Sequence, residues 1–151
     1  MFSTVRYFIK TSLVFLILGL LTGVYMSFAR NVFNWGFGEE LISAHTHVIL
    51  VGSVMMMIMG VALWFFPRPP QDDARYNPSL IRAAYWIITI ATASRFIFQF
   101  ITSYVEIREV RWGITAASAL QVFAIILFFY SMWGRIRPLG SALREKEGEK
   151  F

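Results

Sequence analysis

Two histidines, His45 and His47, are the only imidazoles of the chain, and they stand at the start of a long apolar run. The chain has no cysteine, which excludes disulfides, thiolate metal sites, iron–sulfur clusters and cysteine-linked prosthetic groups. Any transition metal must therefore be held by imidazole, carboxylate, thioether or amide groups. Successive helical residues are about 100° apart, so His45 and His47 diverge by about 200°. One regular helix cannot clamp one metal ion with both, as an i, i+4 pair can.

The composition is that of an integral membrane protein. Of 151 residues, 57% are hydrophobic, 17% aromatic and 15% charged. The net charge of +5 does not indicate nucleic-acid binding, because the basic residues lie at the ends of apolar runs and not along one polar face. A helix needs about 20 apolar residues to cross a bilayer. Runs of this kind cover approximately residues 11–29, 43–66, 79–104 and 112–133.

We therefore predict an all-α membrane protein in which four transmembrane helices form an up-down bundle. Prolines after Phe66 should end the second helix, and Pro78 should begin the third. Residues 1–138 are predicted to form one transmembrane domain, and residues 139–151 a charged cytoplasmic tail. Lys and Arg are concentrated on one side, which predicts cytoplasmic N and C termini and places the histidines near the outer face. That side has residues 6, 10, 68, 75, 82, 135, 137, 144, 146 and 150, and the other has only Arg30, Arg108 and Arg111.

Arg95 is the one basic residue that lies deep inside an apolar run. A guanidinium in hydrocarbon costs at least about 3 kcal/mol, so Arg95 must face protein, water or a bound anion. Thr92, Gln99, Thr102 and Glu106 recur with Arg95 at spacings of three and four residues. This spacing predicts one polar stripe along the third helix.

Two interpretations of the polar stripe remain open at this point. Arg95 and Gln99 are candidates for binding polar groups of a cofactor, because Arg can pair with a carboxylate through two hydrogen bonds. Alternatively, the stripe hydrogen-bonds the neighbouring helix through Ser118 and Gln121. Gly19 and Gly23 on the first helix offer a further surface for close packing between helices.

The histidines also allow two interpretations. They can bond water or carbonyl groups near the lipid headgroups, or ligate a metal. Besides His45 and His47, only methionine could ligate a soft transition metal, and histidine is the usual axial ligand of a membrane haem b. Gly52 and Gly60 share the helical face of His45 and would let a flat macrocycle approach the backbone. The run of Met residues at 55–57 is better explained by core packing.

The stretch "SAHTHVILVGSVMMMIMGVALWFFP" resembles the second transmembrane helix of subunit I in the haem-copper oxidase superfamily, which includes cbb3-type oxidases and nitric oxide reductases. In that helix one histidine ligates the low-spin haem, and the resemblance assigns this role to His45. His47 has no such role in the large enzymes. The stretch is also similar to small four-helix homologues of cbb3-type subunit I, which carry His-x-His at this place. The resemblance implies the prokaryotic cytoplasmic membrane.

A complete haem-copper enzyme needs more histidines than His45 and His47. We therefore expect that the chain is not by itself an oxygen or nitric oxide reductase, and its status as an enzyme is uncertain. If it binds haem b, the sixth ligand comes from another copy, from a different subunit or from outside the protein. A homodimer could share one haem between two His45 residues, or pair His45 of one chain with His47 of the other.

The resulting hypothesis is that the chain is a membrane haem b protein. It would act in electron transfer or bind a diatomic gas, nitric oxide or oxygen. The cofactor-binding candidates are His45, His47, Gly52, Arg95 and Gln99, with iron on His45 or His47. The expected partners are membrane lipid, a second copy of the chain, and a respiratory complex or electron donor. One alternative is a non-catalytic accessory or assembly subunit of a respiratory oxidase or reductase, with transient metal binding. Another is a small anion transporter lined by the polar stripe.

Overall fold

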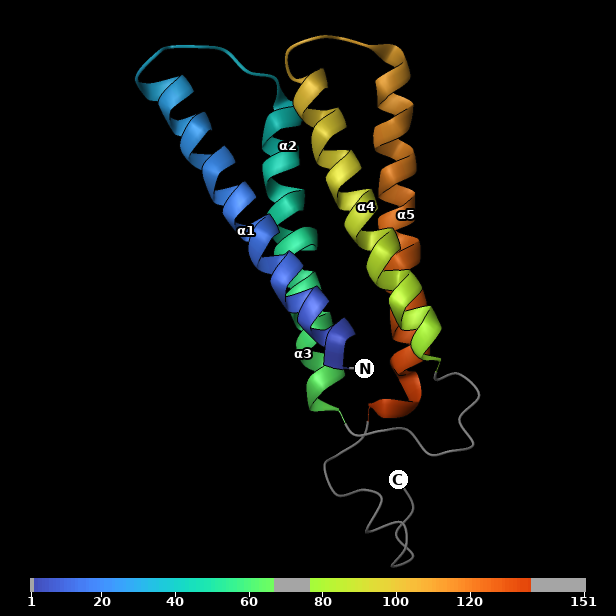
Figure 1. The fold of residues 1–151 in the computed structure, drawn as a ribbon. Helices are drawn as coiled ribbons and strands as arrows, with labels where there is room; N and C mark the ends of the chain where they lie inside the picture. Colours follow the sequence, from blue (N-terminus) through green and yellow to red (C-terminus); the bar gives the residue numbers. More distant parts are fainter. Residues whose placement is uncertain (1, 67–76, 137–151) are drawn as a thin grey trace, which may run out of the picture.

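The computed structural model describes residues 2–66 and 77–136, and every regular element in these two ranges is helical. Four helices are long and apolar enough to span a membrane, as predicted. The second of them is continuous from Glu39 to Phe65. The elements, drawn in Figure 1, are α1 (Phe2–Asn31), α2 (Glu39–His47), the π-helix η1 (Val48–Met55), α3 (Met56–Phe65), α4 (Pro78–Thr102), α5 (Arg108–Met132) and the 3₁₀ turn η2 (Trp133–Arg135).

Two helix boundaries show how local chemistry sets the ends of the spans. Helix α1 begins at Phe2, well before the predicted start at residue 11, and so includes Arg6 and Lys10. Long basic side chains can extend to the water while their stems stay in lipid, so they do not end a helix. Helix α4 begins at Pro78, as predicted, and the Asn77 side chain caps it by accepting a hydrogen bond from the Ser79 N–H at 2.8 Å. The predicted boundary between residues 138 and 139, and the charged tail, lie outside the described residues.

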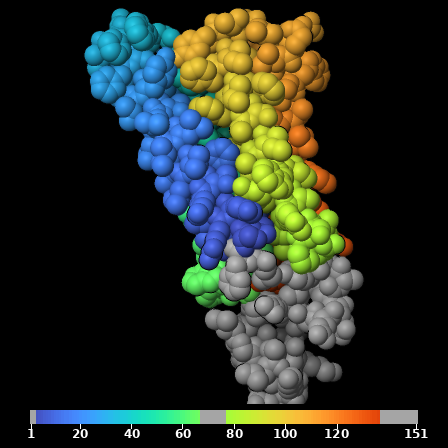
Figure 2. All heavy atoms as spheres, in the orientation of Figure 1, coloured from blue at the N-terminus to red at the C-terminus, as the bar shows by residue number. Residues whose placement is uncertain are grey.

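The spans pack as two pairs, α4 with α5 and α1 with the second span, and the two pairs differ in how closely their helices lie. Helices α4 and α5 run antiparallel and in contact along their length, whereas α1 crosses the second span and contacts chiefly η1 and α3 (Figure 1). Towards the connections 32–38 and 103–107, α1 diverges from α2. We call this the outer end, following the predicted topology. Seen from one side, α1 and α4 cover most of the second span (Figure 2).

The apolar core lies in the half of the bundle away from the outer end. Phe8 of α1 packs edge-on against Tyr85 of α4 and Phe128 of α5. Met56 and Met59 of α3 are fully buried in the same cluster. Their flexible side chains fill irregular space between the helices. The outward faces of all four spans are instead rich in exposed large apolar residues, as the surface of a membrane-embedded protein requires.

Arg135 departs from its predicted role as a flanking loop charge, because it is only 1% exposed. Its Nη2 donates hydrogen bonds to the carbonyl oxygens of Leu63 at 3.0 Å and Phe66 at 2.6 Å. These carbonyls lie at the end of α3, where the helix leaves its last acceptors without backbone donors. A cation there also complements the negative end of the helix dipole. Arg135 therefore joins the ends of the second and fourth spans.

Tyrosines contribute two further connections between helices. The Tyr85 hydroxyl lies 2.8 Å from Thr11 Oγ1, which links α4 to α1. At the outer end the Tyr25 and Tyr104 hydroxyls are 2.6 Å apart. Burial and this hydrogen bond raise the pKa of Tyr104 to about 12, so the Tyr104 hydroxyl stays protonated at physiological pH.

We predict that Gly52→Ala destabilises the bundle by about 1–3 kcal/mol, because the added methyl group has no room. A Cβ at Gly52 would lie 2.9 Å from Cγ of Phe15 and 3.0 Å from Cγ2 of Thr92, neither of which is a flexible side-chain end. Gly36→Ala is the matched control, since a Cβ there would meet no atom within 4 Å. Thermal unfolding in detergent measures both. Equal midpoints for the two variants would contradict the packing of α1 and α4 around η1.

Candidate functional site

His45 faces α1. Its Nδ1 lies 2.9 Å from the carbonyl oxygen of Gly19. Since a carbonyl oxygen only accepts, Nδ1 of the neutral ring carries the proton and Nε2 keeps its lone pair. A backbone carbonyl that holds Nδ1–H in this way is the usual arrangement behind a histidine that binds metal through Nε2. No other described residue forms a hydrogen bond with His45 Nε2.

Glycines in α1 make room for this imidazole. A Cβ on Gly23 would lie 3.0 Å from Cε1 of His45, and a Cβ on Gly19 would overlap the side chain of Ile49. The Gly19 and Gly23 pair is thus the surface on which α1 packs against the second span within one chain. His45 lies in the last turn of α2 and contacts both Gly19 and Gly23 of α1.

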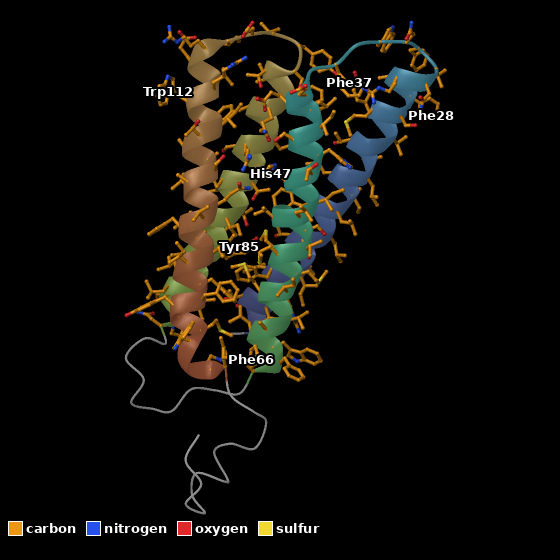
Figure 3. All side chains as sticks on the ribbon, turned by 180° about the vertical axis from the view of Figure 1, so that it is seen from behind. Phe28, Phe37, His47, Phe66, Tyr85 and Trp112 are labelled. Atoms are coloured by element: carbon orange, nitrogen blue, oxygen red, sulfur yellow. The ribbon has the colours of Figure 1, made fainter. Side chains whose placement is uncertain are left out.

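His47 lies on the other side of the second span. Its Nδ1 is 2.9 Å from the Ser43 carbonyl oxygen, so this ring also keeps an unprotonated Nε2. Ser43, one turn earlier on the same face, accepts a hydrogen bond from Gln99 of α4. Figure 3 shows His47 between α2 and the α4–α5 pair. The predicted divergence of the two histidines is therefore found within one regular segment, and they address different neighbours.

The helix changes its winding directly after His47. Residues Val48–Met55 form a π-helix, which has wider turns than an α-helix. Such segments are rare in proteins, and many of those that occur lie at functional sites. The extra residue per turn shifts every later side chain relative to His45, so the face expected from α-helical spacing does not continue unchanged. The space beside Gly52, expected to be an open groove, is occupied by Phe15 and Thr92. In this conformation a flat macrocycle cannot rest against Gly52.

Side chains of α2 and α4 form the outer part of a buried polar network. Gln99, only 2% exposed, donates from Nε2 to Glu40 Oε2 at 3.0 Å and to Ser43 Oγ at 2.8 Å. A carboxylate accepts but does not donate, so this orientation of the amide is the one that suits Glu40. Sequence reasoning missed Glu40 and Ser43. Glu40 lies seven residues and Ser43 four residues before His47, and this spacing is the signal that would have placed all three on one helical face.

The inner part of the network joins α4 to α5. Arg95 Nη1 donates to Gln121 Oε1 at 2.9 Å, and Gln121 Nε2 donates to Thr92 Oγ1 at 2.9 Å. The prediction that the stripe bonds the neighbouring helix through Gln121 is confirmed. The same prediction for Ser118 is wrong, because its hydroxyl donates to the Ile114 carbonyl of its own helix. The short Ser118 side chain forms its hydrogen bond with a carbonyl of its own helix. The longer Gln121 side chain instead forms hydrogen bonds with Arg95 and Thr92 of α4.

The stripe does not continue to the outer end. Thr102 donates to carbonyls of its own helix, and Glu106 pairs with Arg111 in an exposed ion pair of 2.9 Å. The helix ends at Thr102, so the helical spacing that linked Glu106 to Arg95 no longer applies there.

Two buried polar atoms of the network have no partner among the described residues, namely Arg95 Nε and Gln99 Oε1. Such atoms are rare and call for a ligand, ion or water. Nη1 of Arg95 is taken by Gln121, so the other edge of the guanidinium, formed by Nε and Nη2, is free. This edge has the geometry that binds a carboxylate through two hydrogen bonds.

A family model comparison decides the family of this helical bundle. The model for cytochrome c and quinol oxidase polypeptide I matches residues 3–148. The chain belongs to this oxidase polypeptide I family. The match confirms the resemblance to haem-copper oxidase subunit I and extends it from one helix to nearly the whole chain, and with it the assignment to a membrane. No curated protein and no solved structure gave a significant match.

Subunit I of the haem-copper oxidases binds haem, and the described residues of this oxidase polypeptide I family member offer few donors for its iron. In residues 2–66 and 77–136 no three His, Asp or Glu side chains gather as a metal site. Any iron would therefore rest on single imidazoles. His45, with its Nδ1 held by Gly19 and its Nε2 lone pair, fits an axial ligand. The free edge of Arg95 fits a carboxylate group.

We predict that Gln121→Leu costs about 2–3 kcal/mol of stability, because it removes an acceptor from a charged donor and leaves both Arg95 and Thr92 buried with fewer partners. Ser118→Ala is the control on the same helix. Its hydroxyl bonds only its own backbone, so its loss should change stability little. Unfolding in mixed micelles compares the two. If they differ by less than about 0.5 kcal/mol, the network does not stabilise the α4–α5 pair.

Proposed function

We propose that this oxidase polypeptide I family member is a membrane haem b protein whose iron is ligated by Nε2 of His45. The observation that carries the proposal is the hydrogen bond from His45 Nδ1 to the Gly19 carbonyl, which orients the ring and leaves Nε2 available. The family relationship supports it, because haem binding is a property of subunit I. When bound, haem supplies one-electron redox chemistry and a coordination position for a diatomic gas.

The sixth ligand decides the biochemical role. Two imidazoles on one iron suit electron transfer, whereas one imidazole with an open position suits nitric oxide or oxygen binding. His45 and His47 contact different neighbours, so one chain does not offer both to one iron. We propose a homodimer, in which either two His45 residues share a haem or His45 of each protomer pairs with His47 of its partner.

The Arg95 guanidinium is proposed to bind a haem propionate through its free Nε and Nη2 edge. A carboxylate there would satisfy the unpartnered Nε–H and neutralise a charge that lies within a membrane span. Arg95 lies one turn before Gln99 on α4, and Gln99 and His47 both bond Ser43 of α2. If the propionate is bound there, the exchanged pair in which His47 contributes to the haem is the better of the two dimers.

We predict that His45→Ala abolishes the Soret and α/β bands of protein expressed with ample haem if two His45 residues share the haem, and weakens and shifts them in the exchanged pair, where one His47 remains on the iron. His47→Ala is the matched variant. It should shift the bands in the exchanged pair, where only His45 would remain on the iron, and leave them unchanged if two His45 residues share the haem. One haem per two chains supports the shared site, and one haem per chain supports the exchanged pair.

Spectra that are unchanged in His45→Ala would refute the assignment of iron to His45. Absence of haem from every preparation would refute haem binding altogether. Co-purification of a haem-free chain with a larger oxidase or reductase would then establish the alternative, a non-catalytic accessory or assembly subunit.

We further predict that Arg95→Gln lowers haem affinity about ten-fold, the loss expected for one charge-assisted pair. Gln121→Leu serves as control, because it breaks the same network while leaving the guanidinium in place. Haem titration of the apoprotein in detergent measures both affinities. Equal losses in the two variants would mean that the network supports the fold and that Arg95 does not bind a propionate.

A further inference from the structure

A surface cavity of about 550 Å³ opens at the first turns of α5, away from the histidines and the polar network. Its lining combines charge, an aromatic ring and a hydroxyl, from Glu106, Arg108, Arg111, Trp112 and Thr115. Trp112 is 73% exposed and stands out from α5 at the outer end (Figure 3). A tryptophan in this position is typical of the headgroup level of a membrane.

The cavity is cationic. Arg111 bonds Glu106 at 2.9 Å, but both side chains are mostly exposed, so the pair is weak and can open. Arg108 forms no ion pair with any described residue. Glu109, the next residue along the helix, does not line the cavity. The two guanidinium groups therefore outnumber the single carboxylate and present donors suited to a phosphate.

An apolar path continues from the cavity into the membrane. Thr115, Ala119, Val122 and Ile126 follow each other at spacings of three and four residues, which places them on one face of α5. All four are exposed. Ala119 has the smallest side chain on this face and follows Thr115 of the cavity by one turn. A ligand that fits the whole surface has an anionic head and an apolar chain.

We infer that this surface binds an anionic phospholipid, with its phosphate between Arg108 and Arg111 and one acyl chain along Ala119, Val122 and Ile126. Trp112 lies at the junction between the two parts of the lipid. The inference is independent of haem, since none of these residues belongs to the proposed haem site. Basic residues near a membrane surface generally attract anionic lipids without fixing their position. The inferred site differs because it holds one lipid at a fixed place on the exposed face of α5.

Native mass spectrometry of the full chain in detergent tests the site with added phosphatidylglycerol. We expect Arg108→Gln combined with Arg111→Gln to weaken retention of one lipid about ten-fold, and lysine at both positions to keep it. Arg30→Gln is the matched control, because Arg30 is an exposed outer-end arginine that lies over the Phe37 ring, 5.6 Å from its centre. Equal retention in the double variant and in Arg30→Gln would overturn the inference.

A second variant tests whether the acyl chain of the lipid contributes to binding in addition to the phosphate. Ala119→Phe fills the apolar path on an exposed face, so it should weaken phosphatidylglycerol binding without lowering the thermal unfolding midpoint. If Ala119→Phe has no effect while inorganic phosphate displaces the lipid, the cavity binds a free phosphate and the acyl-chain assignment fails. If phosphatidylcholine is retained as well as phosphatidylglycerol, the preference for anionic lipid fails.

Discussion

Hydrocarbon does not solvate polar groups, and this constraint shapes every part of the bundle. Backbone groups are satisfied inside the helices, so four long helices form the described part of the chain. Arg135 shows the same constraint at a helix end, where its guanidinium bonds carbonyls that α3 leaves without donors. Arg95 shows it in the middle of a span, where its guanidinium donates to the Gln121 amide of α5.

The fully buried Arg135 and the partly buried Arg95 differ in what they leave unsatisfied. Arg135 contacts two carbonyls and joins two spans, which is a structural role. Arg95 retains an unpartnered Nε, and one turn later on α4 Gln99 Oε1 is unpartnered as well. Leaving buried polar atoms without partners costs about 1–3 kcal/mol each, so such atoms persist where something else binds. The proposed propionate accounts for the donor in this pair.

The spacing of the two histidines answered one question about their role and left another open. A separation of two residues excludes one shared metal on a regular helix, and the structure agrees with that exclusion. Spacing alone could not find the π-helix after His47, because no residue pattern in residues 48–55 distinguishes it from α-helix. For this reason the groove expected at Gly52 was wrong, and the ring of Phe15 lies there.

The sequence by itself determined the class of fold, the number of spans, the start of the third span at Pro78, and the stripe that contains Arg95. These depend on local hydrophobicity and helical spacing, which are properties of neighbouring residues. Only the tertiary structure decided that His45 faces Gly19 while His47 faces the α4 side, that Gln121 rather than Ser118 reaches the stripe, and that Arg135 is buried. Those outcomes depend on how helices distant in sequence cross and pack, and on which polar group lacks a partner within its own helix.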